Sequence, residues 1–482
     1  MMNKMISRRN WRVRGIPCAW ISLVVAMTAA PMARAQSAVV PPGDGTPAIP
    51  YQISQIGHLV WMGEQVGSSS GKYYSVQYDI DGSATAGWNG GAGFPSIGTN
   101  YDTRFMGVFN GNGKVIGGLT INRPGQDFVG FFGYVGSGGV VKDIGLVNCT
   151  VTGGNYVGGL AARNFGVVSG CRVTGSVEGR GNLAGGLLAD NGGTVSNSSA
   201  ASSVKGANNV GGLIGDNYGP VSKCFATGAA EGMYYVGGLA GYNDHGNVSE
   251  CYATGLATGY QYVGGLAGEN YHGTMSDCYA TGSLAGGLLG VTYVGGLAGA
   301  NVGGTVSRCY ASGAVTGNSP VGGLLGSSSV VTATNCYWDV QTSGQATSAG
   351  GAGKTTAQMK QPATYAGWNF VDVWSIRENW TYPYFAEACD GVDNDGDGQI
   401  DEDCRVAKTC FALAQSVNCT GAGWSRTFVM DLTNFRNLAV QDGYQSYAVT
   451  YALYYNIWTG VYLYDYDAGA FSAVTWLMNL DL

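Results

Sequence analysis

Charged side chains are scarce in this sequence of 482 residues, since Asp, Glu, Lys and Arg together supply only 11%. Disordered chains combine high charge with few aromatic residues, and this one has 30 tyrosines, so its composition excludes general disorder. Neither the His-Glu-x-x-His motif of metalloproteases nor the Gly-x-Ser-x-Gly elbow of hydrolases occurs. The sequence is instead rich in glycine, with 82 residues, alongside many Tyr, Val and Thr. That mixture is typical of tightly turned β-structure.

Residues 1–35 have the pattern of a signal peptide. A basic start precedes a mostly apolar run, Ile16 to Ala30, and Ala33-Arg34-Ala35 has the small-x-small pattern of a cleavage site. We therefore expect a mature chain that begins at Gln36 and is secreted, either extracellular or at a bacterial cell surface. No later segment is apolar enough for a transmembrane helix. Loss of six basic residues takes the formal charge from −7 to about −13, which argues against a nucleic-acid partner.

One phrase repeats from residue 129 onwards: Val-Gly-Gly-Leu, four further residues that end in Asn, and then Cys-x-x-Thr-Gly. Its leucines are Leu160, Leu187, Leu213, Leu239, Leu266, Leu297 and Leu324. The period is about 27 residues, with no helical pattern inside it, and units of this kind stack as coils. We predict an all-β fold: a right-handed parallel β-helix with capping segments, about three short strands per coil, and a small C-terminal β region. The one long unit is explained by a turn insertion at 283–286.

Three further columns follow from the repeat. The Asn column (Asn164 to Asn301) is expected to form a hydrogen-bonded ladder along the stack. The Cys column has an odd count, and Ser198 fills one gap, so we expect packed free thiols rather than disulfides. An aromatic residue often follows each Cys, as at Tyr252 and Tyr279. Neighbouring strand residues face opposite ways, so this stripe should face outwards, as a candidate contact surface or a stabilising ladder.

The repeat resembles the GLUG family of bacterial surface proteins. The resemblance is carried by the run from Gly238 to Gly241, by Asn243, by the run from Cys251 to Gly255, and by a lead-in from Phe109 to Ile116. It covers about residues 51–340. It implies a β-helix in a surface or adhesin-like setting and implies no reaction.

The sequence divides into six segments. They are a signal peptide (1–35), an N-terminal cap and first coil (36–128), the GLUG-repeat β-helix (129–340), a loop and C-terminal cap (341–388), an acidic loop (389–404) and an aromatic-rich β region (405–482).

The acidic loop is the sharpest chemical pattern in the chain. Asp at alternating positions, followed by Gly398 and Ile400, is the opening of a Ca²⁺ loop, although Cys404 stands where the loop's bidentate Glu normally lies. The segment also resembles a short bacterial Cys-Asp-Gly-x-Asp-Asn-Asp metal-binding motif, and we favour a disulfide between Cys389 and Cys404 that closes the loop. A solvated acidic linker is the alternative. The expected Ca²⁺ ligands are Asp393, Asp395, Asp397, Gln399, Asp401 and Glu402.

The function expected from these patterns is a non-enzymatic, adhesin-like or structural binding module with a Ca²⁺-stabilised segment. Its ligand would be an unidentified cell-surface or extracellular molecule, with a glycan among the candidates. The alternative is a carbohydrate-active β-helix enzyme, because Asp190 and Asp216 should lie on successive coils about 5 Å apart. A surface charge ladder with Arg163 would explain the same residues. His245 and His272, one coil apart, could share a metal ion or lie in exposed turns.

Overall fold

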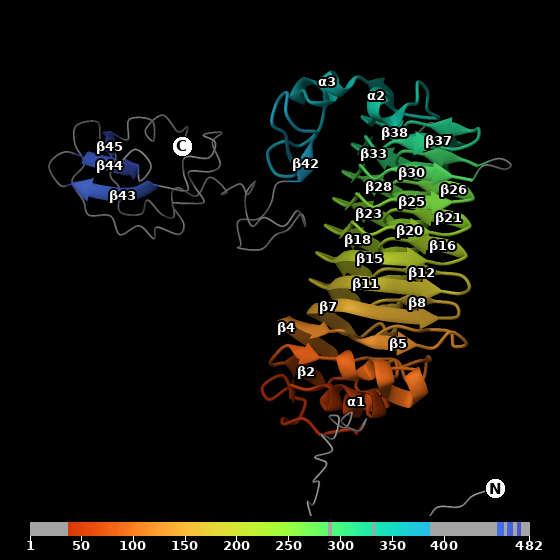
Figure 1. The fold of residues 1–482 in the computed structure, drawn as a ribbon, viewed down its shortest axis with the longest axis vertical. Coiled ribbons are helices and arrows are strands. Elements are labelled where there is room, and N and C mark those ends of the chain that lie inside the picture. Colours follow the sequence, from red (N-terminus) through yellow and green to blue (C-terminus); the bar gives the residue numbers. More distant parts are fainter. Residues whose placement is uncertain are drawn as a thin grey trace, which may run out of the picture. The chain divides into compact units, whose positions relative to one another are not determined.

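The computed structural model describes residues 37–287, 292–329 and 333–385, together with the backbone of three strands between 451 and 473. It is a parallel β-solenoid, as the repeat predicts, with a small antiparallel sheet near the C-terminus (Figure 1). That sheet consists of β43 (Tyr451–Asn456), β44 (Gly460–Asp465) and β45 (Ala470–Ala473). The predicted signal peptide, the acidic loop and its six expected Ca²⁺ ligands lie outside the described residues.

Three parallel sheets run along the solenoid. The first has seven strands: β8 (Val157–Gly158), β12 (Ala184–Gly185), β16 (Asn208–Gly211), β21 (Tyr234–Gly237), β26 (Gln261–Gly264), β31 (Val294–Gly295) and β36 (Val321–Gly322). The second has eight: β6 (Phe132–Val135), β9 (Ala161–Asn164), β13 (Leu188–Asn191), β17 (Ile214–Asn217), β22 (Ala240–Asp244), β27 (Ala267–Tyr271), β32 (Ala298–Val302) and β37 (Leu325–Ser328).

The third sheet has 25 strands and takes up the rest of every coil. Its first strands are β1 (Tyr51–Ile53), β2 (Tyr73–Val76), β3 (Ile80–Asp81), β4 (Val108–Gly117), β5 (Thr120–Asn122), β7 (Val140–Gly153), β10 (Val167–Ser169), β11 (Arg172–Gly179), β14 (Thr194–Ser196), β15 (Ser199–Lys205), β18 (Pro220–Ser222), β19 (Phe225–Ala226) and β20 (Ala230–Glu231). Its later strands are β23 (Asn247–Ser249), β24 (Tyr252–Ala253), β25 (Ala257–Gly259), β28 (Thr274–Ser276), β29 (Tyr279–Ala280), β30 (Leu284–Gly286), β33 (Thr305–Ser307), β34 (Tyr310–Ala311), β35 (Val315–Thr316), β38 (Ala333–Thr334), β39 (Tyr337–Asp339) and β40 (Ala352–Lys354).

A typical coil therefore holds five short strands, β21 to β25, rather than the three expected. The Gly-Gly pair joins the first two strands at a corner where backbones lie too close for any side chain. A Cβ on Gly237 would stand 1.9 Å from the Ala240 carbonyl oxygen, and one on Gly238 would stand 2.1 Å from the Gly265 oxygen of the next coil. Only glycine fits such an approach, which explains why the pair recurs in the repeat.

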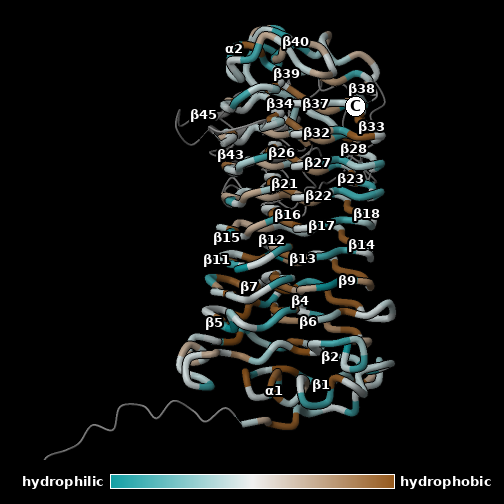
Figure 2. The backbone as a smooth tube through the Cα atoms, turned by 90° about the vertical axis from the view of Figure 1, so that its right-hand side faces the viewer, coloured by the Kyte–Doolittle hydropathy of each residue, from teal (hydrophilic) through white to brown (hydrophobic). Residues whose placement is uncertain are grey.

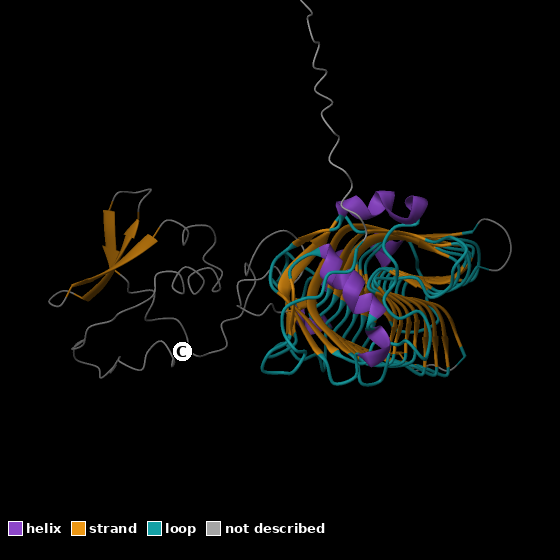
Figure 3. Cartoon of the chain, turned by 90° about the horizontal axis from the view of Figure 1, so that it is seen from below, coloured by secondary structure: helices purple, strands orange, loops and turns teal. Residues whose placement is uncertain are grey.

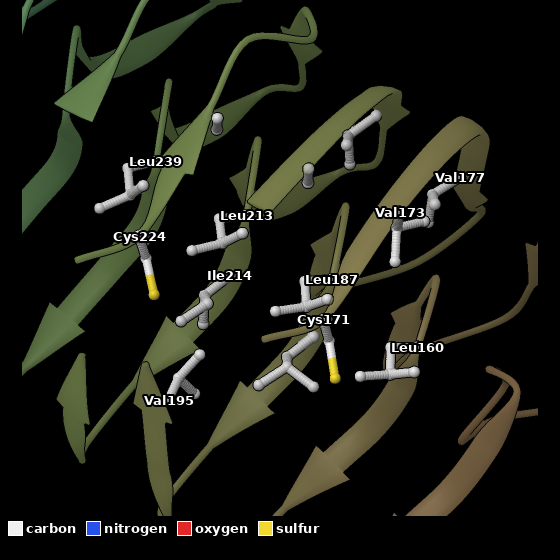
Figure 4. Packing of buried hydrophobic residues seen from close by; sticks show 14 of the residues in the cluster. Leu160, Cys171, Val173, Val177, Leu187, Val195, Leu213, Ile214, Cys224 and Leu239 are labelled. Atoms are coloured by element: carbon white, nitrogen blue, oxygen red, sulfur yellow. The ribbon is translucent and has the colours of Figure 1, made fainter. Parts of the chain in front are cut away.

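The leucine column fills the interior of the solenoid, as predicted. Leu213 and Leu239 are at most 1% exposed, and their backbones pair coil on coil, with Leu213 N donating to the Leu239 oxygen at 2.9 Å. Figure 4 shows Leu160, Leu187, Leu213 and Leu239 in one line with Cys171 and Cys224 beside them. Apolar segments recur at matching positions in successive coils (Figure 2). Burial of this column drives the stacking.

The asparagine column forms the predicted ladder. Each amide Nδ2 donates to the Oδ1 of the next asparagine at 2.7–2.8 Å, from Asn164 through to Asn301. All six side chains are fully buried. A buried amide needs partners for its donors and its acceptor, and identical residues in register supply them to one another.

The seven cysteines of the Cys column are free and buried, as predicted. Each thiol from Cys171 onwards donates to the carbonyl two residues earlier, at 3.1–3.3 Å. Ser198 reproduces this pattern, because its hydroxyl donates to the Ser196 oxygen at 2.8 Å and accepts from Cys171 N at 3.1 Å. Burial raises the pKa of the Cys171 thiol to about 12, which keeps it protonated and unreactive.

The predicted turn insertion at 283–286 is wrong. Strand β30 pairs in register with β25, Ala257 opposite Leu284 and Gly259 opposite Gly286. Since Tyr262 then aligns with Tyr293, the four extra residues lie between Gly286 and Tyr293. The apolar Leu284, 2% exposed, is needed in the core, so the strand keeps its register and the extra residues come after it.

The parallel strands begin before the repeat. Strand β1 pairs with β2, and β2 pairs with β4. Helix α1 (Ile56–Glu64) and two 3₁₀ segments (66–68 and 83–91) belong to this end. Figure 3 looks along the stack from this end and shows the superimposed coils with a helix across them. Buried Leu59 and Met62 of α1 join the core, so the helix covers apolar side chains that the first coil would expose.

Residues 355–385, which we term the strap, follow the last coil and lie along the outside of the solenoid. Strand β40 pairs with β39, after helix α2 (Val340–Ser343). The strap then comprises α3 (Thr356–Met359), a 3₁₀ turn (362–364), β41 (Trp374–Ser375) and β42 (Tyr384–Phe385).

The strap covers the outward aromatic stripe, for which the sequence left open a contact surface or a stabilising ladder. Tyr252, Tyr279, Tyr310 and Tyr337 do face out of the solenoid and stack at 4.8–5.2 Å where neighbouring rings are paired. They are nevertheless only 2–8% exposed, because strap residues such as Trp368 and Trp374 pack against them. The contact-surface alternative is therefore wrong, since an apolar stripe this long is more stable buried under the same chain. The stacked rings agree with the alternative of a stabilising ladder.

Candidate functional site

The position before each ladder asparagine lines one outer face of the solenoid. Register pairs place Tyr134 opposite Arg163, Arg163 opposite Asp190, and Asp190 opposite Asp216. The column continues through Tyr242 to Glu269. The structure thus brings Asp190 and Asp216 together on successive coils, as the spacing predicted.

Two further columns flank this line of polar groups. One contains the residue two positions before each Gly-Gly pair, including Tyr156 and Leu183, with backbone φ of 55° and 60°. Residues other than glycine rarely adopt this left-handed backbone conformation. The packing of the coil therefore holds the turn at these residues in place. The other contains the residue after each ladder asparagine, such as Phe165 and Tyr218.

A pocket of about 270 Å³ opens where these columns have small side chains. Gly192 stands between Phe165 and Tyr218 in its column, and a Cβ there would lie 2.7 Å from the Phe165 ring. In the other column, the position after Tyr156 is occupied by Leu183. This side of the pocket therefore also lacks an aromatic ring at the level of Asp190. The pocket is lined by Tyr156, Arg163, Phe165, Leu183, Asp190, Gly192, Asp216 and Tyr218.

Arg163 is held by one carboxylate and surrounded by rings. Its Nε donates to Asp190 Oδ2 at 2.6 Å. The guanidinium carbon lies 5.0–5.9 Å from four ring centroids, those of Phe128, Tyr134, Tyr156 and Phe165. Cation–π attraction and the ion pair together hold the guanidinium in place. Within the described chain, its two Nη nitrogens form no hydrogen bond, and its side chain is 30% exposed.

Asp216 occupies the opposite side of the pocket. Its Oδ2 accepts from Tyr218 Oη at 3.0 Å and from Asn209 Nδ2 at 3.3 Å. Burial is the main reason that the pKa of Asp216 rises to about 7, with further contributions from the negative charges of Asp190 and Asp244. Asp216 therefore carries a proton under mildly acidic conditions.

Asp190 is also buried, and its environment is mixed. Burial raises the pKa of its carboxyl group, while Arg163 opposes that rise. The Oδ1 atoms of Asp190 and Asp216 are both inaccessible and have no hydrogen-bond partner among the described residues. Two unsatisfied acidic oxygens on neighbouring strands are costly, and such groups occur mainly where a ligand, a proton or a functional role compensates them.

The interpretation of these residues as a surface charge ladder is wrong for the two aspartates, which are only 2% and 5% exposed. Arg163 contacts Asp190, while Tyr218 and Asn209 contact Asp216. His245 and His272 do lie in exposed turns, with stacked rings 5.2 Å apart. Within the described ranges, no group of three or more His, Cys, Asp or Glu side chains could hold a metal ion.

The same face extends along the solenoid beyond the pocket. Tyr235, Tyr262 and Tyr293 stack with ring centroids 4.8 and 4.9 Å apart, and Tyr242 lies edge-on to Tyr235 at 5.2 Å. Burial raises the pKa of Glu269, in the next coil, to about 7. The pocket is thus one end of a longer strip of aromatic rings and buried acids.

The sequence indicated the polar column of this site but missed its walls. Tyr156, Leu183, Phe165, Gly192 and Tyr218 vary from unit to unit, so they attract no attention as a motif. The sequence signal that could have identified them is their constant position relative to the Gly-Gly pair and the ladder asparagine. Aligning the units on those two marks would have shown rings on both sides of Arg163 and one ring, Tyr218, beside Asp216.

Comparisons with known proteins agree with the repeat. Four segments, residues 153–178, 232–258, 259–285 and 290–316, match the family described as the GLUG motif. A curated protein named Halomucin, from Haloquadratum walsbyi, is 38% identical over 141 residues, 28% of this chain. A proposed Gly-rich membrane protein of Evansella cellulosilytica is 36% identical over 143 residues, 29% of this chain. The aligned parts span only 2% and 16% of those relatives.

Among solved structures, a proposed immunoglobulin A1 protease from Bacteroides ovatus is similar over 71% of this chain and 94% of its own. The TM-score is 0.44 and the sequence identity is 21%. Across the described residues, the structure contains no helix that is both long and apolar enough to cross a membrane.

Proposed function

We propose that this protein is an exported, surface-associated β-solenoid that binds a glycan on the face carrying Arg163, Asp190 and Asp216. The observation that carries the proposal is the pocket itself, in which aromatic rings flank a small set of polar groups. Sugar rings have apolar C–H faces and hydroxyl edges. Aromatic walls pack against the faces, and the Arg163 Nη nitrogens and Tyr218 Oη are placed to bond the hydroxyls.

Export is supported by three features. The leader has the pattern of a signal peptide, the GLUG resemblance implies a surface setting, and two curated relatives are named Halomucin and a Gly-rich membrane protein. Cell fractionation followed by N-terminal sequencing tests it. We expect the protein outside the cytoplasm with Gln36 as its first residue, and intact cytoplasmic protein would contradict export.

Glycan binding is tested with the purified mature chain on a panel of polysaccharides and oligosaccharides, by affinity electrophoresis and calorimetry. Tyr218→Ala should weaken binding at least tenfold, because it removes a wall and a hydrogen-bonding group together. Tyr78→Ala is the matched control, since Tyr78 is 70% exposed and outside the pocket. Binding that is equal in the two variants, or absent across the panel, would overturn the proposal.

A second candidate function is glycan hydrolysis, which the side-by-side carboxyl groups favour. Paired carboxyl groups about 5 Å apart act in retaining glycosidases. Two observations favour binding instead. The Asp190 and Asp216 Oδ1 atoms are inaccessible, and Asp190 is engaged by Arg163. Assaying the bound polysaccharides for new reducing ends separates the two functions, and we expect no increase above an Asp190→Asn variant.

A Ca²⁺-stabilised segment at 389–404 belongs to the same proposal. Seven acids within sixteen residues repel one another unless a cation or water compensates them. Hard cations with oxygen ligands do so, and extracellular loops with affinities of ~10⁻⁴–10⁻³ M bind Ca²⁺. The role of Ca²⁺ here would be structural, since the expected ligands are carboxylates and one amide.

A further inference from the structure

We infer that the pocket is a subsite for one uncharged sugar ring, and that Arg163, Asp190 and Asp216 reject charged sugars. This inference rests on the proposed function and adds the class of ligand. The pocket of about 270 Å³ is slightly smaller than the ~300–1,000 Å³ of typical ligand sites, which suits one ring of a longer chain.

The first argument is the pairing of Arg163. A uronic acid would need a cation for its carboxylate, yet the guanidinium is already paired with Asp190 through a 2.6 Å contact. The Asp190 side chain is only 3% exposed, so its charge is poorly screened by solvent. An incoming carboxylate would also face Asp216, which becomes negatively charged as the pH rises through about 7. Like charges repel more strongly where protein rather than water surrounds them.

The second argument concerns cationic sugars. The guanidinium already occupies the position that faces four aromatic rings, so an ammonium group has no free ring face in that corner. The remaining acid, Asp216, is engaged by Tyr218 and Asn209 through one oxygen, and its other oxygen is inaccessible. An ammonium group would lose water without gaining a full ion pair, which is costly.

The third argument is that the groups in the pocket suit hydroxyls. The Arg163 Nη nitrogens are donors, and Tyr218 Oη, whose proton is given to Asp216, offers lone pairs as an acceptor. Phe165 and Tyr156 supply the apolar walls. With the pKa of Asp216 near 7, Arg163 and Asp190 balance each other and the pocket is close to neutral below that pH. Above it, the pocket gains a negative charge.

The experiment compares oligosaccharides of glucose, glucuronic acid and glucosamine, equal in length and linkage, on the mature chain at pH 6. Where the panel identifies another neutral binder, its own acid and amine counterparts are used. We expect the neutral form to bind at least tenfold more tightly than both charged forms. Raising the pH from 6 to 8.5 should weaken uronate binding further in the wild type but not in Asp216→Asn, which cannot ionise.

The double variant Arg163→Gln/Asp190→Asn removes both charges together, and so avoids leaving one buried and unpaired. We expect it to fold and to discriminate less against charged sugars. Circular dichroism and thermal unfolding confirm its folding. Charged sugars that bind as tightly as the neutral form would overturn this inference while leaving glycan binding intact. Absence of binding by every sugar would overturn both.

Discussion

Tyr310 donates a hydrogen bond from its phenol to the carbonyl oxygen of Pro383 at 2.7 Å, across 73 residues of sequence. The bond joins the outward aromatic ladder of the solenoid to the strap. Trp368 Nε1 adds a second bond, to the Asn335 oxygen at 2.9 Å, and Tyr382 Oη adds a third, to Asp339 Oδ2 at 2.7 Å. The strap is therefore anchored by directional bonds as well as by packing, and its position over the tyrosines is specific.

Replacing Trp374 by Ala should destabilise the protein by about 3–5 kcal/mol, because this fully buried ring packs against Tyr279, Tyr310 and Phe385. Trp380→Ala, at a ring that is 75% exposed, is the control and should cost little. Chemical denaturation measures both. Equal costs for the two tryptophans would show that the strap does not seal the ladder.

Replacing Leu239 by Ala should cost about 2–5 kcal/mol, because the side chain is fully enclosed by its neighbours in the core. Leu256→Ala is the matched control, since Leu256 lies in the same region of sequence but is 47% exposed. Urea unfolding of the two variants provides the comparison. A small effect at Leu239 would mean that the leucine column contributes less to stacking than its burial indicates.

Cys251 and Cys278 should be recovered as free thiols by mass mapping of non-reduced peptides, and should react with alkylating reagents only after unfolding. Burial raises the pKa of both thiols, so little reactive thiolate forms in the folded chain. Cys251→Ser should be well tolerated, because Ser198, two positions earlier in the column, already makes the same bonds. Cys251→Leu should cost about 1–3 kcal/mol by overpacking. A disulfide joining the two cysteines would refute this description.

Protonation of Asp216 should make stability depend on pH. Its folded pKa of about 7 lies above the ordinary value of 3.8, so the folded state binds more protons between those two values. Stability from this group is therefore complete below pH 4, falls as the pH rises to about 7, and stays constant above it. In Asp216→Asn, this decrease in the free energy of unfolding with pH should disappear. The part of the pH dependence that Glu269 contributes should remain. Denaturant unfolding at pH 4.5, 6 and 7.5 tests this, and parallel curves for the two proteins would contradict it.

Calcium binding at 389–404 should be detectable by calorimetry of the mature chain at millimolar Ca²⁺. Asp395→Asn/Asp397→Asn should abolish the heat, because it removes two of the expected carboxylate ligands. Asp102→Asn, at an exposed acid in the N-terminal region, is the control. Heat that is unchanged in the double variant, or absent from the wild type, would leave the solvated acidic linker as the explanation.

The pairing register between successive coils was predictable because every coil repeats the same pattern of about 27 residues. Leu213 stacks on Leu239, and Asn217 bonds to Asn243, for the same reason that their units are similar in sequence. In-register stacking buries the apolar residue and satisfies the amide at once, so repetition itself selects the pairing. The same logic placed Asp190 beside Asp216, although it left open whether they were exposed.

The sequence by itself thus determined the coil, its period and the residues that face the interior. Only the tertiary structure decided what covers the outer faces. The strap has no period to match against Tyr279 and Tyr310, so its contacts across many residues carry no repeated pattern. The burial of Asp216 likewise depends on the bulk of side chains in two adjacent columns, Asn209 and Tyr218 among them. Burial is a property of all the neighbours in space, and it sets both the pKa of Asp216 and the shape of the pocket.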